Sequence, residues 1–191
     1  MDHEPTPGLI GRRTLLKGAG VAGLGIAGIG AAAIPAEAAS YSQNGFPVIT
    51  SSSSTALDAF SVRGVSFPNG VRAGNPYVIL RWVAKQFHDH VEPLHAGWCW
   101  GYNYKFISGT AVYSNHASGT AIDLNAPDHP RGVSGTFTAA QRTQIHKILD
   151  YCDGVVAWGG QFSTTIDAMH FEIGLRWKNP RIGALAAKIK G

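Results

Sequence analysis

Apolar positions recur along this chain with two different periods, which predict helices and strands. Helical spacing extends from residue 75 towards Pro93, from 138 to 154, and from 179 to the C-terminus. Each range opens on a helix-start signal, and these signals are Asn75-Pro76, the capping-box pattern Thr138-Ala-Ala-Gln141, and Asn179-Pro180. We therefore expect three helices over these ranges.

The segments between the predicted helices are typical of short strands. Residues 98–106 are rich in aromatic side chains, and residues 155–158 form a short apolar run. Residues 120–125 and 169–173 alternate, so that their charged or histidine side chains lie opposite their apolar neighbours. This order predicts a small, single α+β domain with a mostly antiparallel sheet flanked by helices.

The N-terminus has the three-part pattern of an export signal. Arg12-Arg13 precedes an uncharged stretch rich in glycine and alanine, which is followed by the small-x-small pattern Ala36-Glu37-Ala38. The paired arginines indicate transient use of the twin-arginine export machinery. The stretch is too weakly apolar to favour a permanent membrane span, and a retained anchor is the alternative. We expect residues 1–38 to be a twin-arginine signal peptide, 39–75 a linker and N-terminal arm, and 76–191 the folded domain.

Composition narrows the possible functions. With 15% charged and 45% hydrophobic residues, the 191-residue chain is neither a charged disordered protein nor a coiled coil. A net charge of +4 is too small to indicate nucleic-acid binding without a motif. The two cysteines, Cys99 and Cys152, are too few for a disulfide-rich scaffold or a four-cysteine zinc module. After export they could form a disulfide or remain two buried thiols, and both outcomes stay open.

Two predicted strands carry titratable side chains against an apolar background. Asp123 lies between Ile122 and Leu124, and His170 lies between Met169 and Phe171. A turn at Ser118-Gly119 would bring His116 back towards Asp123. Two histidines and one carboxylate suit a catalytic zinc ion, whose fourth position is left for water.

These residues and their neighbours also allow simpler structural roles. Asp167, three residues before His170, could act as a base for water, or it could simply form the turn. A hydrogen-bonded core cluster is the alternative to a zinc site. The segment His88-Asp89-His90 lies at a predicted helix end, where solvated histidines are favoured, so we expect no metal there.

Two motifs resemble those of a known family. Residues 114–123, Ser-Asn-His-Ala-Ser-Gly-Thr-Ala-Ile-Asp, resemble the Ser-x-His-x-x-Gly-x-Ala-x-Asp motif of the M15 zinc peptidases. Residues 167–172, Asp-Ala-Met-His-Phe-Glu, resemble their Asp-x-x-His-Phe-Glu motif, and Trp158-Gly159-Gly160 fits the pattern before it. The resemblance extends from about Tyr77 to Ile173 and covers D-alanyl-D-alanine carboxypeptidases and L-alanyl-D-glutamate endopeptidases.

The resemblance implies a hedgehog/DD-peptidase-like fold and one Zn²⁺ per chain. The implied ligands are His116, Asp123 and His170, and the implied general base is Asp167. Many members have an arginine before the first motif that stabilises the oxyanion. Lys105 stands in that region here, and because lysine lacks the planar fork of arginine, its role stays open.

Two further residues of the motifs are expected to bind substrate. Ser114 could contact substrate or only bond the turn. Glu172 could contact substrate, orient a ligand, or be an exposed carboxylate at a strand edge.

The resemblance implies a zinc metallopeptidase that hydrolyses an amide bond in peptidoglycan or muropeptide stem peptides. From the export signal we expect it to be secreted, and we expect it to act as a monomer. Carboxypeptidase and endopeptidase activities both remain open, as do a role in remodelling the host wall and a lytic role. The alternative function is a non-catalytic, zinc-containing module that binds the cell wall. We expect no nucleic-acid partner.

Overall fold

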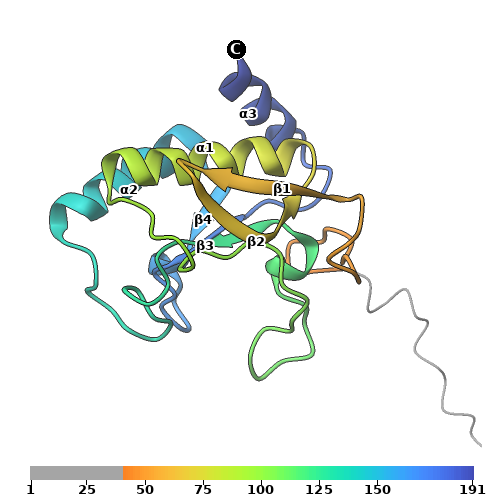
Figure 1. Ribbon diagram of the computed structural model, residues 1–191, viewed down its shortest axis with the longest axis horizontal. Helices are drawn as coiled ribbons and strands as arrows, with labels where there is room; N and C mark the ends of the chain where they lie inside the picture. Colours follow the sequence, from red (N-terminus) through yellow and green to blue (C-terminus); the bar gives the residue numbers. More distant parts are fainter. Residues whose placement is uncertain (1–40) are drawn as a thin grey trace, which may run out of the picture. The chain divides into compact units, whose positions relative to one another are not determined.

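The computed structural model describes residues 41–191, so the predicted signal peptide lies outside the described residues (Figure 1). These residues form three α-helices, five strands and two short 3₁₀ helices. In chain order the elements are β1 (Leu57–Val62), β2 (Val65–Arg72), α1 (Asn75–His90), η2 (Asn115–Ser118), β3 (Ala121–Asp123), α2 (Ala139–Cys152), β4 (Val156–Trp158), η3 (Gly159–Gln161), β5 (His170–Ile173) and α3 (Pro180–Lys190). The predicted α+β class is confirmed. Within residues 41–191, no helix is long and apolar enough to cross a membrane.

The strands form two antiparallel sheets. β1 and β2 make a hairpin, and the second sheet has the order β3-β5-β4. β5 is the central strand of this second sheet and pairs with both neighbours. The register places Asp123 of β3 directly opposite His170 of β5.

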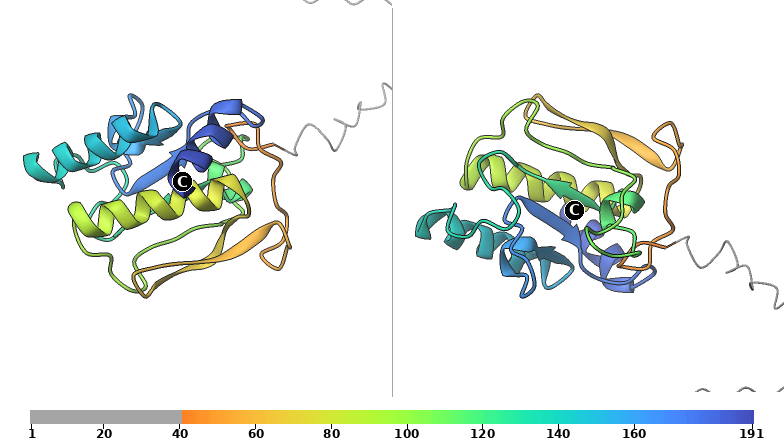
Figure 2. Two further views of the ribbon diagram at one scale, coloured as in Figure 1. Left: turned by 90° about the horizontal axis from the view of Figure 1, so that it is seen from above. Right: turned by 90° about the horizontal axis from the view of Figure 1, so that it is seen from below.

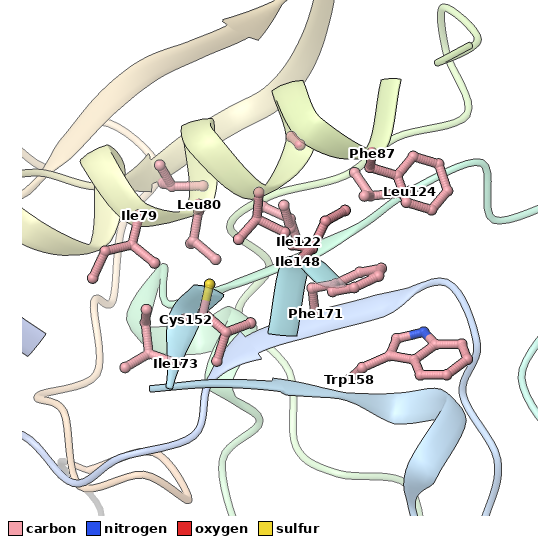
Figure 3. Close-up of a cluster of buried hydrophobic side chains, with 14 of the residues drawn as sticks. Ile79, Leu80, Phe87, Ile122, Leu124, Ile148, Cys152, Trp158, Phe171 and Ile173 are labelled. Carbon is pink, nitrogen blue, oxygen red and sulfur yellow. The ribbon is translucent and has the colours of Figure 1, made fainter. Parts of the chain in front are cut away.

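Helix α1 contacts both the hairpin and the central strand β5 (Figure 2). Its fully buried side chains Ile79, Leu80 and Phe87 meet Ile122 and Phe171 of the three-stranded sheet (Figure 3). Burying an apolar side chain of this size stabilises the fold by about 1.5–3 kcal/mol. Because side chains alternate along a strand, the other face of β3 and β5 carries their polar residues.

The helix starts largely follow the predicted signals. Thr138 and Gln141 form the expected capping box of α2, and Asn179 caps α3 by accepting a hydrogen bond from the backbone N–H of Arg181. The start of α1 differs, because Gly74 is its N-cap and Asn75 is already helical. Gly74 has a φ of 83°, a conformation that glycine adopts without a steric penalty.

The segment 39–75, expected to be a linker and N-terminal arm, contains the β1–β2 hairpin. Phe60 and Phe67 of this hairpin are buried in the core and pack edge to face. Before the hairpin, Ser42 and Asn44 are also buried. The hairpin could not be predicted from the sequence, because it buries only part of its surface and carries many polar residues. The serine run at 51–54 before it also favoured a linker.

Residues 98–106, expected to be a strand, form only two isolated bridges, Trp100 with Asp123 and Phe106 with Tyr113. The backbone N–H of Tyr102 donates instead to Gly70, and that of Asn103 donates to His116. This segment therefore shares its hydrogen bonds among several neighbours and does not form a regular ladder.

Both cysteines are buried and unpaired within the described part of the chain. Burial raises the pKa of Cys152 to about 12 and also raises the pKa of Cys99. Cys152 lies among the core side chains of Figure 3. The sequence left open a disulfide or two buried thiols, and the structure contains two buried thiols.

Candidate active site

Three ligand-type side chains meet on the polar face of the three-stranded sheet. His116 comes from η2, Asp123 from the end of β3 and His170 from the start of β5, and their exposed fractions are only 2%, 6% and 7%. Asp123 Oδ1 lies 3.1 Å from His116 Nε2 and 3.0 Å from His170 Nδ1. The two ring nitrogens are 3.1 Å apart. We call these three residues the triad.

A tight turn delivers His116 to the triad, as the sequence predicted. The Ser114 hydroxyl accepts a hydrogen bond from the backbone N–H of His116 and so begins the turn. Gly119 ends it with a φ of 68°, and a Cβ atom there would lie 2.6 Å from the backbone nitrogen of Arg72. Ser114 therefore bonds the turn and also lines the adjacent cleft, while its contact with substrate stays a prediction.

Hydrogen bonds outside the triad fix the tautomer of each imidazole. The Gly101 carbonyl lies 2.7 Å from His116 Nδ1, and Glu172 Oε2 lies 2.8 Å from His170 Nε2. A carbonyl or a carboxylate oxygen can only accept, so these two ring nitrogens carry the hydrogens. The other nitrogen of each neutral ring then points a lone pair into the triad. Glu172 is buried and orients His170, so it is not an exposed edge carboxylate.

The triad fits a small cation such as zinc. Three electron-rich atoms that face one another at about 3 Å are stable only with a positive charge between them. Metal–ligand bonds of about 2.0–2.1 Å in a tetrahedral site separate neighbouring ligand atoms by about 3.3 Å, close to the observed spacing. Among the described residues, this is the one group of His, Cys, Asp or Glu side chains arranged to hold a metal.

The charges at the triad point to the same need for a cation. Burial raises the pKa of Asp123, but the neighbouring His116 and His170 lower it more, to well below its usual range. Burial lowers the pKa of His170, but hydrogen bonds and charges from Asp123 and Glu172 raise it to about 10. The site therefore holds one positive charge strongly, as a proton when no metal is bound.

A cleft of about 240 Å³ opens over the triad. Loop residues 105–113 lie on the side of the sheet away from α1 (Figure 1), and part of this loop forms one wall. The polar side chains that line the cleft are those of Gln43, Lys105, Ser108, Ser114, His116, Asp123, Arg131, Thr164, Thr165, Asp167, His170 and Glu172.

Asp167 enters this cleft from the turn before β5. Its backbone N–H donates to the Gly159 carbonyl at 2.9 Å, and its own carbonyl accepts from His170 N–H at 3.0 Å. A Cβ atom on Gly159 would lie 2.2 Å from the Asp167 carbonyl oxygen, so only glycine permits this approach. The Trp158-Gly159-Gly160 pattern thus has a structural reason.

The Asp167 carboxylate is set up to exchange a proton. Its Oδ1 is buried and has no hydrogen-bond partner among the described residues, while its Oδ2 lies 3.6 Å from Arg131 Nε. Burial raises the pKa of Asp167, and the charges of His170 and Arg131 oppose this only in part. A carboxylate with a raised pKa in this cleft suits the transfer of a proton from a water bound there.

Two cationic side chains also border the cleft. Lys105 is the first residue of the loop 105–113 and lines the cleft, while its role at the oxyanion stays a prediction. Arg131 was missed by the sequence reasoning, since it belongs to no recognised motif. The loop that carries it is anchored where the backbone N–H of Gly132 donates to the Ile166 carbonyl at 2.7 Å.

The segment His88-Asp89-His90 makes other contacts. Asp89 pairs with Arg63 at 2.7 Å and with Lys85 at 2.8 Å. His88 Nδ1 accepts a hydrogen bond from the backbone N–H of Leu94. These side chains close the end of α1 and line no part of the cleft described above.

Comparison with known proteins finds a match to a peptidase family. Residues 108–173 match an M15 peptidase family described as D-alanyl-D-alanine carboxypeptidase. The matched segment contains both sequence motifs and all three residues of the triad, and it confirms the predicted resemblance. No curated protein and no solved structure matches the chain.

Proposed function

Starting from the M15 peptidase match of residues 108–173, we propose that this protein is a zinc metallopeptidase acting on peptidoglycan stem peptides. The observation that carries the proposal is the convergence of His116 Nε2, Asp123 Oδ1 and His170 Nδ1 in the cleft that also holds Asp167. A metallopeptidase needs both a metal site and a nearby base, because water must be activated next to the group that takes its proton.

His116, Asp123 and His170 would hold the zinc ion. When bound, zinc lowers the pKa of water to about 7 and polarises a carbonyl oxygen. Glu172 and the Gly101 carbonyl keep the two imidazole rings in the tautomers that such binding requires.

Asp167 is the general base of the proposed reaction. Its carboxylate takes a proton from the water as the water oxygen attacks the scissile carbonyl carbon. The carbon–nitrogen bond then breaks, and Asp167 returns the proton to the leaving amine. Arg131 Nε lies 3.6 Å from Asp167 Oδ2, and its charge favours the ionised form of this carboxylate before attack.

Lys105 is our candidate for stabilising the oxyanion. Lys105 lines the same cleft as the triad, and a cation near the developing negative charge lowers the barrier. Ser114 and Glu172 line the same cleft and are proposed to contact the peptide.

The family description favours removal of a terminal D-alanine as the reaction. Cleavage within the stem peptide is the second activity compatible with the motifs. A wall-binding module without catalysis is the weaker alternative, because such a module has no use for a carboxylate with a raised pKa in the cleft of the triad.

We further propose that the chain acts outside the cytoplasm as a monomer. The paired Arg12-Arg13 and the Ala36-Glu37-Ala38 pattern support export by the twin-arginine route with cleavage after Ala38. N-terminal sequencing of the protein from a culture supernatant tests this directly. A mature chain that begins at residue 39 is expected, and a chain that keeps residues 1–38 would contradict export with cleavage.

Zinc dependence tests the proposed chemistry. The purified protein should bind one zinc ion per chain and release new amines from muropeptides. A chelator should abolish this release, and added zinc should restore it. Amine release that survives complete removal of metal would refute the proposal.

A further inference from the structure

Glu172 is the end of a buried chain of hydrogen bonds that starts at the N-terminal segment. Its Oε2 accepts from His170 Nε2 at 2.8 Å and from Asn115 Nδ2 at 2.7 Å. Asn115 Oδ1 in turn accepts from the backbone N–H of Asn44 at 3.0 Å. All four residues are at most 8% exposed, so water does not compete for these bonds.

The direction of this chain is fixed by the groups at its two ends. The backbone N–H of Asn44 can only donate, and the carboxylate of Glu172 can only accept. The Asn115 amide therefore has a single orientation, with Oδ1 towards Asn44 and Nδ2 towards Glu172. Glu172, held in this way, accepts the hydrogen of His170 Nε2 and leaves the lone pair of Nδ1 in the triad.

Asn44 itself is held from several sides. Its Nδ2 donates to Thr120 Oγ1 and to the Ile173 carbonyl, both at 2.9 Å. Its Oδ1 accepts from Ser42 Oγ at 2.7 Å, and its carbonyl accepts from Trp177 N–H at 3.0 Å. These bonds tie it to the residue before β3 and to the last residue of β5, the two strands that carry the triad.

From these contacts we propose that Asn44 and Asn115 are positioning residues that act through Glu172 to hold His170 for the metal. The segment around Ser42–Asn44, predicted to belong to a linker, is thereby part of the catalytic domain. This inference rests on the zinc site of the proposed function, and it adds two residues that are not among the three proposed metal ligands.

Zinc affinity measures this role directly. The affinity of Asn115→Ala, measured in competition with a chelator, should fall by about 10–100-fold, as is usual when a partner of a metal ligand is removed. Excess zinc should restore most of kcat, because Asn115 contacts neither water nor substrate in this role. Asn44→Ala should weaken zinc binding less. The backbone N–H that donates to Asn115 remains in this variant, and only the side-chain hydrogen bonds that hold residue 44 in place are lost.

Gln141→Ala is the matched control. Its side chain also donates to a glutamate, Glu92, at 2.9 Å, but it lies on α2, which does not line the cleft. Its zinc affinity should equal that of the wild type. As a spectroscopic check, the Nε2 proton of His170 should exchange with water faster in zinc-loaded Asn115→Ala than in the zinc-loaded wild type.

Each other outcome has a defined meaning. Unchanged zinc affinity in Asn115→Ala and Asn44→Ala overturns the inference, and so does an equal loss in Gln141→Ala, since that loss reflects general destabilisation. Should Asn115→Ala fail to fold by circular dichroism, Asn44→Ala decides alone. A wild-type protein that binds no zinc refutes the proposed function itself, which distinguishes the two failures.

Discussion

At the scale of single residues, two carboxylates that line the same cleft have pKa values shifted in opposite directions. Asp123 is surrounded by histidines that keep its pKa well below its usual range, whereas burial raises the pKa of Asp167. A metal ligand must stay ionised, and a proton acceptor must also be able to hold a proton. The environment of each carboxylate therefore suits the role proposed for it.

Asp167→Asn tests this division of roles. The amide keeps the shape of the side chain but cannot take a proton, so kcat should fall by about 10²–10⁴-fold. Zinc affinity should change little, because Asp167 is not a member of the triad. Steady-state kinetics with metal analysis checks both, and a variant that retains the full rate would show that Asp167 is not the base.

The pH dependence of the reaction follows from the raised pKa of Asp167. The base must be ionised, so activity should appear as the pH rises through a pKa above the ordinary value for aspartate of about 3.9. Arg131→Ala removes a charge that lowers this pKa and should move the acid limb of kcat/KM to higher pH. A limb that does not move, or that moves to lower pH, would contradict the assignment.

At the scale of elements, the register of β3 against β5 creates the site. Because Asp123 pairs with His170, their side chains leave the same face of the sheet, while Ile122 and Phe171 bury the opposite face against α1. The alternation of these residues along the chain was enough to predict the shared polar face. Their pairing, which depends on contacts between distant segments, came only from the structure.

Gly159→Ala tests how the turn before β5 places the base. The new Cβ would clash with the Asp167 carbonyl oxygen and push this turn away, so kcat should fall at least tenfold while the triad still binds zinc. Gly183→Ala is the control. A Cβ atom on this helical glycine would meet only the Asn75 side chain, at an ordinary contact distance of 3.6 Å, so alanine there should stabilise α3 by about 0.5–1 kcal/mol without changing kcat. Equal kinetics in both variants would show that the turn does not position Asp167.

Sequence reasoning predicted elements with a strong local signal and missed those that depend on distant partners. The capping box at Thr138 and the turn that ends at Gly119 depend only on residues adjacent in the sequence, and both are present. The hairpin of residues 57–72 has an irregular polar and apolar pattern, and Asn44 is a polar residue. Their burial depends on contacts with distant parts of the chain, so it could not be predicted from the local sequence. Arg131 lies in a loop outside both motifs, so its position near Asp167 could not be predicted from the sequence either.

At the scale of the whole molecule, the triad links stability to metal and to pH. In the metal-free protein His170 has a pKa near 10, above its value of about 6.5 in an unfolded chain. A raised pKa contributes stability that is fully present below about pH 6.5 and is lost as the pH rises through about 10.

Thermal unfolding tests this link. The metal-free protein should lose Tm between about pH 6.5 and 10, because His170 gives up its proton there. Zinc should raise Tm, since it binds the folded state, and should remove most of this pH dependence. An identical pH dependence with and without zinc would contradict a metal at the triad.

The central claim is that the triad and Asp167 together hydrolyse a stem-peptide amide. Mass spectrometry of muropeptides after incubation with the zinc-loaded protein tests it most directly. We expect products that have lost one terminal D-alanine, no such loss after chelation, and a rate at least a hundredfold lower with Asp167→Asn. Muropeptides that stay intact with the zinc-loaded wild type, or that are cleaved equally by Asp167→Asn, would contradict it.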